Sequence, residues 1–524
     1  MVSLPMLSAR ITLLVVLIAP LYGKILLSAE KPIETPNVPG YVMIHTGTDV
    51  PGKLIEMLVH FAGGPSAKVI YLTFHADAKS TESPETLKAL EAIRSAKVES
   101  LSIVNVDVKS INDAAFAATL KDATAVWLAD LAPEKLREMC EGTGFGSGLR
   151  LLAERGGAVL AAPVWMETFV PSAAAETSSA TRDAHADLQK RVQARPGTVG
   201  YSFAAGSTLL LHHRSMVVEE GSVSICMAAS ANRPARDERL DAGTSADLVA
   251  FARSARERAN PAFPPATIEP IELKSGTLVI DGGGIPKVAL TRFIEAAGGP
   301  DALILAIPTA QSDDPPLNPG EGRMLRAAGA RNVKTFHLKT RPDAYDAEKI
   351  KILNDAKGIW FCGGRQWRFV DAYLDTPAEQ LMHEVLKRGG AIGGSSAGAT
   401  IQGDYLVRGN PLGNVQMMAE GYERGLGFLK GVAIDQHFTK RKRFADMALL
   451  KRTFPQVLGL GIDEGAAVVV SGHTLEAIGV GPVCVYDKKV PAAANEPDHV
   501  TLMPGDTYDL KTLSKIIPGA AVKP

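Results

Sequence analysis

Residues 388–400 read Arg-Gly-Gly-Ala-Ile-Gly-Gly-Ser-Ser-Ala-Gly-Ala-Thr. Within them, Gly394-x-Ser396-x-Gly398 follows a short apolar run and precedes helix-compatible residues, the pattern of a tight bend from a strand into a helix. Small residues let strand and helix approach closely, and glycine tolerates the unusual dihedrals of such a bend. The pattern makes Ser396 a candidate nucleophile. The alternative is a Gly/Ser-rich strand end that only turns the chain.

The chain repeats itself. Residues 154–159 match residues 387–392, and the motif Ala-Gly-Gly-Pro at residues 62–65 returns at residues 297–300. One collinear unit has therefore been used twice. Each copy opens with an apolar strand, a helical pattern and a second apolar strand; the strands are expected at residues 41–45 and 68–74, and at residues 277–280 and 302–307.

Strands that alternate with helices predict an α/β fold: two tandem, doubly wound and mostly parallel sheets. Reactive groups of such sheets gather at the carboxyl ends of strands, which is where Ser396 is expected. In the first copy, Ser396 aligns with Pro163 and Gly398 aligns with Trp165. Neither residue supplies a nucleophile, so the first copy is predicted to be non-catalytic. Its tail, residues 172–260, is rich in Ala, Ser and Arg and is expected to contain helices of its own.

The N-terminus has the pattern of an export signal. Arg10 precedes the apolar run of residues 11–19, and the small residues before Glu30 suit a cleavage site. Pro20 and Lys24 interrupt the apolar run, which argues against a stable membrane span by this segment, and none is expected once the signal is cleaved. The sequence thus predicts an exported protein, periplasmic or extracellular, with an uncleaved anchor as the alternative. The expected division is a signal or anchor at 1–29, a linker at 30–39, a non-catalytic domain at 40–260, a linker at 261–275 and a catalytic domain at 276–524.

Composition excludes several classes of function. The 524 residues are 46% hydrophobic with a net charge of -1, which argues against electrostatic binding of nucleic acid. The four cysteines lie far apart with no zinc-site spacing. His212-His213 and Glu219-Glu220 lack a third partner at ligand spacing, so neither a metal nor a cofactor is expected.

A serine needs a base to accept its proton, and histidine is the usual one near neutral pH. His437 follows the apolar residues 431–434 and is the candidate base. The cations at residues 440–443 suit either a solvated helix start or a pocket for an acidic group, because arginine can hold a carboxylate through two hydrogen bonds.

Two glycine-rich turns complete the expected site. Residues 361–366, Phe-Cys-Gly-Gly-Arg-Gln, end another apolar strand, and the Gly364 amide is expected to stabilise an oxyanion together with the amide of Ala397. Residues 281–284, Asp-Gly-Gly-Gly, lack the spacing of a phosphate-binding loop and are expected to form a tight turn beside the active site.

These motifs resemble the cyanophycinase branch of the serine peptidases, which includes aspartyl dipeptidase. The resemblance covers residues 276–486 and rests on residues 394–399, 363–366, 435–443 and 459–464, in the right order. It implies a flavodoxin-like, class I glutamine amidotransferase-like fold and hydrolysis of peptide bonds at aspartyl residues, β-linked ones included. It implies Ser396 as nucleophile, His437 as base, and a substrate site lined by Gln366, Asp435, Gln436, Arg441 and Arg443.

The sequence departs from that family at three positions. Arg365 stands where the family has Asp, and Asp446 stands where a third arginine is expected. No carboxylate lies near residues 413–414, where the acid that orients the base is expected. Asn414 is the first candidate there, and the alternatives are Asp404, Glu420 and Glu423. An amide cannot stabilise the imidazolium by charge, which predicts a slower enzyme.

Asp463-Glu464 is read as a buried structural pair near the pocket, with contact to the catalytic centre as the alternative. The leading hypothesis is an exported serine peptidase acting on aspartyl peptides. The competing one is a non-catalytic protein that binds acidic or Asp-containing peptides. The sequence leaves a homo-oligomer open, because the first copy can occupy the surface of a partner subunit.

Overall fold

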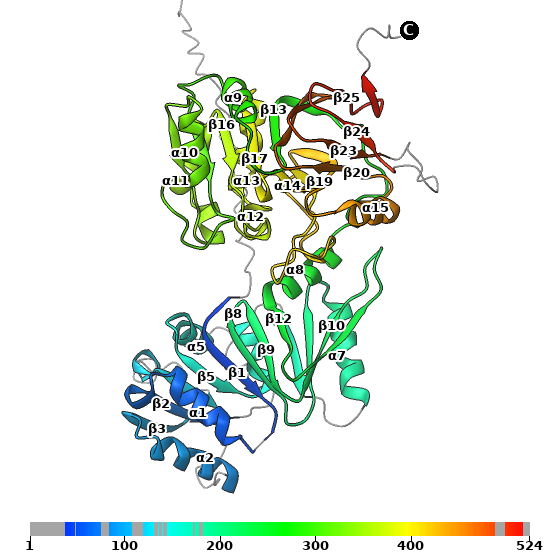
Figure 1. Cartoon of the computed structure of the whole chain (residues 1–524). Coiled ribbons are helices and arrows are strands. Elements are labelled where there is room, and N and C mark those ends of the chain that lie inside the picture. The colour runs from blue at the N-terminus through cyan, green and yellow to red at the C-terminus, as the bar shows by residue number, and fades with distance from the viewer. Residues whose placement is uncertain are drawn as a thin grey trace, which may run out of the picture.

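The computed structural model describes residues 37–47, 49–74, 83–106, 119–129, 135, 139, 144–170, 173–177, 182–487 and 498–516. They form two lobes that meet at helix α8 (Leu248–Ala259), the green helix at the centre of Figure 1. The expected signal at residues 1–29 lies outside the described residues. Among the residues described, no helix is both long enough and apolar enough to cross a membrane.

The second lobe contains a nine-stranded sheet with strand order β15-β14-β16-β17-β13-β21-β22-β25-β26. The five strands from β15 to β13 are parallel, and β21 runs antiparallel to β13. Short apolar runs such as Ile-Leu-Ala-Ile in β14 are buried along their whole length, as expected of strands covered on both faces. The strands are β13 (Leu273–Asp281), β14 (Ile304–Ile307), β15 (Val333–Thr335), β16 (Gly358–Phe361), β17 (Ala391–Ser395), β21 (Ala466–Gly472), β22 (Thr474–Gly479), β25 (Thr507–Asp509) and β26 (Ser514–Ile516).

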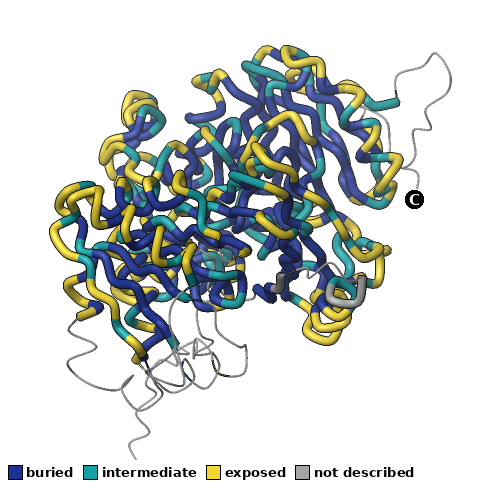
Figure 2. Tube along the Cα trace, turned by 90° about the horizontal axis from the view of Figure 1, so that it is seen from below, coloured by how far each residue is buried: buried dark blue, intermediate teal, exposed yellow. Residues whose placement is uncertain are grey.

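A smaller sheet of order β18-β19-β20-β23-β24 stands beside the first and was not expected from the sequence. Its strands are β18 (Gly403–Tyr405), β19 (Leu429–Gln436), β20 (Leu458–Ile462), β23 (Val483–Tyr486) and β24 (Val500–Leu502). The helices of this lobe are α9 (Lys287–Ala296), α10 (Gly320–Ala327), α11 (Ala347–Ile350), α12 (Trp367–Tyr373), α13 (Pro377–Lys387), α14 (Ala397–Thr400) and α15 (Phe444–Thr453), with short 3-10 turns at Arg341–Tyr345 and Lys351–Asn354. The strands of both sheets are mostly buried. Figure 2 shows the buried residues at the centre of the molecule and the exposed ones at its outer turns.

The first lobe also has two sheets, with strand orders β12-β9-β8-β1-β5-β4-β2-β3 and β11-β10-β7-β6. The strands are β1 (Val38–His45), β2 (Lys68–Thr73), β3 (Ser100–Asn105), β4 (Ala125–Leu128), β5 (Ala158–Ala161), β6 (Ala173–Thr177), β7 (Val199–Phe203), β8 (Thr208–His213), β9 (Ser215–Glu220), β10 (Ser222–Met227), β11 (Arg236–Asp241) and β12 (Ser245–Asp247). The other helices are α1 (Gly52–Phe61), α2 (Pro84–Ser95), α5 (Phe145–Glu154), α6 (Met166–Phe169) and α7 (Arg182–Ala194), with 3-10 turns at Gly64–Ser66 and Pro163–Trp165.

Residues 172–260 were expected to contain helices of their own, and α7 and α8 lie there; the strands of this segment were not expected. Seven strands, β6 to β12, lie there beside helices α7 and α8. The Ala, Ser and Arg content of the whole segment obscures short runs such as Thr-Leu-Leu-Leu in β8 and Met-Val-Val in β9, whose apolar side chains favour strands.

Strand order is alike in the two lobes: β1, β2, β4, β5 and β8 hold the relative places of β13, β14, β16, β17 and β21. After β5, where the second lobe has Ser396, the first lobe has a 3-10 turn at Pro163–Trp165. The Trp165 side chain is fully buried, and its indole N–H donates to the Ala129 carbonyl at 3.1 Å. An apolar ring thus fills the place of the serine bend.

Candidate active site

Ser396 lies between β17 and α14 with φ 56° and ψ -114°, a backbone conformation that side chains rarely adopt. A Cβ atom on Gly398 would lie 1.9 Å from the Phe361 carbonyl oxygen, and one on Gly394 would lie 2.5 Å from the Gly398 oxygen. The two glycines are therefore required by close backbone contacts. Ser396 is partly exposed, whereas the other residues from 391 to 400 are buried. The bend holds the hydroxyl at the carboxyl edge of the main sheet.

The Ser396 hydroxyl lies 3.0 Å from Nε2 of His437. His437 follows β19 of the smaller sheet, and its backbone N–H donates to the Gly282 carbonyl at 2.8 Å. On the other side of the ring, Nδ1 lies 2.8 Å from Oε1 of Glu464. A carboxylate on Nδ1 keeps the proton there and leaves the Nε2 lone pair for the hydroxyl. The three side chains have the order of groups that activates a serine.

The expected third member, Asn414, is not the partner of His437. The Asn414 side chain is exposed, and its carbonyl oxygen accepts a hydrogen bond from Arg408 at 3.3 Å. Of the alternatives, Asp404 accepts the Val432 N–H, while Glu420 and Glu423 pair with arginines of the first lobe. Glu464 reaches the ring because the turn after β20 crosses from the smaller sheet to β21 of the main sheet. The sequence left open, as an alternative, that Asp463-Glu464 contacts the catalytic centre. In the structure, Glu464 makes this contact.

Charges around the ring set the proton affinity of His437. Burial and the nearby Arg441 guanidinium lower the pKa of His437 below its ordinary value, and Glu464 opposes them. The Lys440 ammonium bonds the second carboxylate oxygen of Glu464 and, with His437, keeps the pKa of that carboxyl below its usual range. The ring is therefore neutral, and able to act as a base, near neutral pH.

The turn at residues 281–284 packs directly against the catalytic groups. The Ser396 N–H donates to the Asp281 carbonyl at 3.1 Å. A Cβ atom on Gly283, which has φ +127°, would lie 2.4 Å from Cε1 of His437. This turn thus supports the serine and the histidine together, because no side chain larger than hydrogen fits beneath the ring.

The candidate oxyanion turn lies on the other side of the serine. A Cβ atom on Gly363 would lie 3.4 Å from Cβ of Ser396, so the turn and the nucleophile are in contact distance. Glu321 fixes this turn: its carboxylate accepts the Gly363 N–H at 2.7 Å and the indole N–H of Trp360 at 2.6 Å. Burial raises the pKa of Glu321 to about 7. Gly364, at φ +143°, follows at the exposed side.

The residues expected to line the substrate site divide into two groups. Gln366, Asp435 and Arg443 are buried and bonded within the protein. The amide of Gln366 donates to the carbonyls of Val407 and Arg408, both at 2.8 Å. Asp435 accepts from Arg443 at 2.6 Å and from Arg408 at 3.0 Å. These side chains hold the walls of the site, and their charges are compensated. Asp446, at the expected third-arginine position, also pairs with Arg408 at 2.7 Å.

Arg441 and Gln436 differ from that group. Arg441 is exposed, and among the described residues no carboxylate lies within ion-pair distance of it. Its charge nevertheless reaches His437, whose pKa it lowers. Gln436 is 5% exposed, and its side-chain oxygen has no hydrogen-bond partner within the described part of the chain. Both side chains retain unused hydrogen-bonding capacity beside the base.

Within the described ranges, no three His, Cys, Asp or Glu side chains are grouped so as to hold a metal ion. Cys362, next to the oxyanion turn, is buried, and burial raises the pKa of its thiol, so it is not the nucleophile.

The model of peptidase family S51 matches residues 278–478, which include Ser396, His437 and Glu464. A cyanophycinase of Geminocystis herdmanii is 32% identical over 230 residues, covering 43% of this chain and 84% of that protein. The chain belongs to peptidase family S51. A cyanophycinase of Synechococcus elongatus is also 32% identical, over 45% of this chain and 80% of that protein. A crystal structure of a peptidase from an acI-B1 Actinobacterium has 23% identity and a TM-score of 0.36, over 45% of this chain and 97% of that one.

This member of family S51 is a serine-type peptidase. Sequence reasoning placed its serine, histidine and both glycine turns and missed the role of Glu464. The available signal was the position of Glu464 directly after β20 of the sheet that carries His437. In a sheet of parallel strands, residues that follow neighbouring strands lie at the same edge.

Proposed function

We propose that this protein hydrolyses peptide bonds at aspartyl residues, β-linked ones included, through an acyl-enzyme on Ser396. The observation that carries the proposal is the hydrogen-bonded series Ser396–His437–Glu464, with distances of 3.0 Å and 2.8 Å. The proposal requires no cofactor.

The reaction follows from where the proton can go. As Oγ of Ser396 attacks the carbonyl carbon, Nε2 of His437 takes the hydroxyl proton. The N–H groups of Gly364 and Ala397 hold the oxyanion of the tetrahedral intermediate. The imidazolium then gives its proton to the leaving amine, which leaves an ester on Ser396. A water molecule, deprotonated by the same ring, hydrolyses that ester and restores the hydroxyl.

Arg441 supports the choice of an acidic substrate. It is the cation beside His437 whose charge no carboxylate of the described residues neutralises. An arginine can hold a carboxylate through two hydrogen bonds. Asp435 and Arg443 neutralise one another instead, so we assign them to the wall of the site rather than to the substrate.

The test combines labelling with matched substrates. A fluorophosphonate should modify Ser396, and Ser396→Ala should abolish both labelling and turnover. Peptides with α- or β-linked Asp should be cleaved, whereas the same peptides with Asn should not. The proposal is refuted if the wild-type protein is not modified by the fluorophosphonate and cleaves none of these peptides, yet binds the Asp peptides. The chain would then be a binding protein.

We also propose that the protein is exported and that the first lobe is a non-catalytic copy. Arg10 and the apolar residues 11–19 support export, and the buried Trp165 in place of the serine bend supports the second point. N-terminal sequencing of the protein recovered from the periplasm or the medium should begin near Glu30. Recovery of the full chain from the cytoplasm would refute export.

A further inference from the structure

Three arginines of the first lobe form hydrogen bonds with residues 420–422 of the second lobe. Arg258 donates to the Glu420 carboxylate at 2.5 Å, and Arg253 donates to the Gly421 carbonyl at 3.0 Å. Arg214 donates to the Tyr422 hydroxyl at 2.8 Å and to Asp371 at 2.9 Å. Arg253 and Arg258 are 1% and 8% exposed. We call these contacts the interlobe clamp; they lie where α8 meets the loops of the second lobe in Figure 1.

The interlobe clamp includes close backbone contact between α8 and the segment at Gly421. Gly421 has φ +85°, and a Cβ atom on it would lie 2.8 Å from the Ser254 nitrogen and 2.9 Å from the Ala250 oxygen of α8. Tyr422 is fully buried, and the Arg253 guanidinium lies 5.0 Å from the centre of its ring. Helix and segment are therefore packed backbone against backbone.

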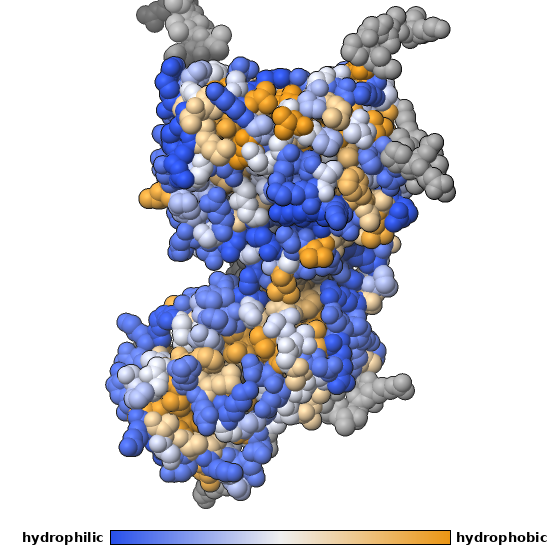
Figure 3. Space-filling model, viewed as in Figure 1, coloured by the Kyte–Doolittle hydropathy of each residue, from blue (hydrophilic) through white to orange (hydrophobic). Residues whose placement is uncertain are grey.

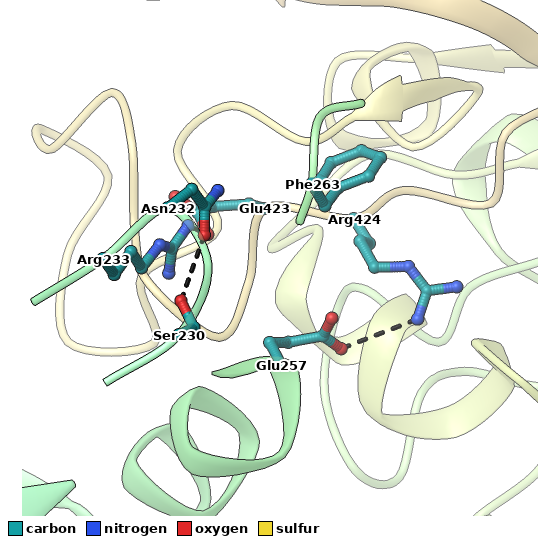
Figure 4. A pocket seen from close by; sticks show the side chains of 7 residues that line it. All are labelled: Ser230, Asn232, Arg233, Glu257, Phe263, Glu423 and Arg424. Atoms are coloured by element: carbon teal, nitrogen blue, oxygen red, sulfur yellow. Dashed lines mark hydrogen bonds and ion pairs between the residues drawn. The ribbon is translucent and has the colours of Figure 1, made fainter. Parts of the chain in front are cut away.

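Charged pairs from both lobes extend the clamp. Arg233 pairs with Glu423, and Glu257 of α8 lies 3.6 Å from Arg424. Figure 4 shows these side chains around a small cavity that Phe263 of the interlobe linker also lines. The charged side chains that line this cavity form ion pairs between the two lobes. We therefore read the cavity as part of the contact between the lobes and not as a binding site for a charged ligand. Elsewhere the viewed surface is mostly polar, with apolar side chains in separate small groups (Figure 3).

The clamped segment leads directly to the catalytic centre. The Leu406 N–H donates to the Glu423 carbonyl at 2.8 Å. The segment held by the first lobe is therefore hydrogen-bonded to the residue that directly follows β18. Gln366, two residues after Gly364, donates to the carbonyls of Val407 and Arg408. Arg408 in turn bonds Asp435, two residues before His437.

The loop between these ends is held from the oxyanion side. Arg365, next to Gly364, donates to the carbonyls of Asn410 and Gly413 at 2.6 Å and 2.9 Å. The Arg408 N–H donates to the Met417 carbonyl at 2.9 Å. Residues 406–424 thus form one loop whose first end contacts the catalytic walls and whose second end is held by the first lobe.

We propose that the first lobe is a positioning partner within the same chain, which holds the loop 406–424 against the catalytic centre so that the loop can bind substrate. The proposal rests on the proposed function, because it assigns the loop to the substrate site of that reaction. The first lobe acts only through the loop and contributes no catalytic residue. Its loss of a serine bend is then compatible with a retained role.

Two variants and a matched control test the proposal in the full-length chain. Gly421→Ala places a methyl group against α8, and Tyr422→Phe removes only the hydroxyl that Arg214 and Asp371 bind. Gly329→Ala is the control, because Gly329 also has positive φ but no atom lies within 4 Å of an added Cβ. Amide hydrogen exchange of residues 406–424, the fluorophosphonate labelling rate, and kcat and KM for an aspartyl peptide are measured for each.

We expect faster exchange in the loop and a KM raised at least about fivefold for Tyr422→Phe, because the variant loses the hydrogen bonds of the hydroxyl with Arg214 and Asp371. Gly421→Ala should raise KM further, while kcat and the labelling rate stay near wild type. Unchanged exchange in both variants would overturn the proposal, as would faster exchange with an unchanged KM. If the wild type labels but cleaves no aspartyl peptide, the proposed function fails, and the exchange data still decide whether the first lobe holds the loop.

Discussion

Glu464 and His437 lie 2.8 Å apart although 27 positions separate them in the sequence. Nδ1 of the ring faces the carboxylate, and the same carboxylate receives the Lys440 ammonium. The acid is therefore shared between the base and a surface cation. Glu464 is not a buried acid, because its side chain is 31% exposed.

Glu464→Gln should lower kcat about a hundred- to ten-thousandfold, since an amide neither fixes the tautomer nor stabilises the imidazolium. The rate is measured with the best Asp peptide, and circular dichroism checks the fold. Asn414→Ala should leave kcat near wild type, because the Asn414 side chain is exposed and its carbonyl survives the change. A large loss for Asn414→Ala with little loss for Glu464→Gln would restore the sequence-based assignment.

The pH dependence should reveal the cation beside the ring. His437 must be neutral to act, and its pKa lies below the ordinary value of 6.5 because of burial and Arg441. The midpoint of the fall in kcat/KM at acid pH should therefore lie below 6.5. Arg441→Gln removes a charge that opposes the imidazolium, so the acid limb should move to higher pH. Arg331→Gln removes an exposed cation that pairs with Asp301 and should leave the limb in place.

Glu321→Gln should weaken the oxyanion turn, because the carboxylate accepts two N–H groups and an amide oxygen can replace only part of that. We expect kcat to fall about tenfold or more while KM changes little. The measurement is a comparison of kcat and KM with wild type. A proportional loss of labelling by the fluorophosphonate is also expected, since both reactions develop charge at the same place.

The same carboxyl should make stability depend on pH. Folding raises the pKa of Glu321 from 4.5 to about 7, so the folded state holds this proton more tightly. The resulting stabilisation is complete below about 4.5 and is lost as the pH rises through about 7. Urea unfolding at several pH values should show this decline, and Glu321→Gln should reduce the slope. Asp281, whose pKa burial raises to about 6, contributes a decline of the same sign in both proteins.

Gly283→Ala should displace the His437 ring, because the added Cβ would lie 2.4 Å from Cε1. We expect a loss of kcat of at least about a hundredfold with the fold retained. Gly299→Ala is the matched control: Gly299 also has positive φ, but no atom lies within 4 Å of an added Cβ. Similar kinetics of the two variants would show that backbone strain, rather than contact with the ring, decides the outcome.

Local patterns made much of the site predictable. The bend at Ser396 needs glycines at residues 394 and 398 because backbone atoms approach them, and this requirement leaves a recognisable spacing. His437 was readable because it follows an apolar strand. The turn beginning at Asp281 was predictable because its glycines lack the spacing of a phosphate-binding loop, which leaves a tight turn as their interpretation. The smaller sheet of each lobe was not expected, because an apolar run predicts a strand but does not say which strands it pairs with.

Short sequence patterns were sufficient to predict the α/β class, the candidate nucleophile, the candidate base and the glycine turns, because each depends on residues that are neighbours in the chain. The packing of the two sheets decides which acid meets His437, and it brings Asp435 and Arg443 together as an ion pair. Electrostatic partnership depends on distances of a few ångströms between side chains from different strands. Spacing along the chain does not encode those distances until the two sheets are packed together.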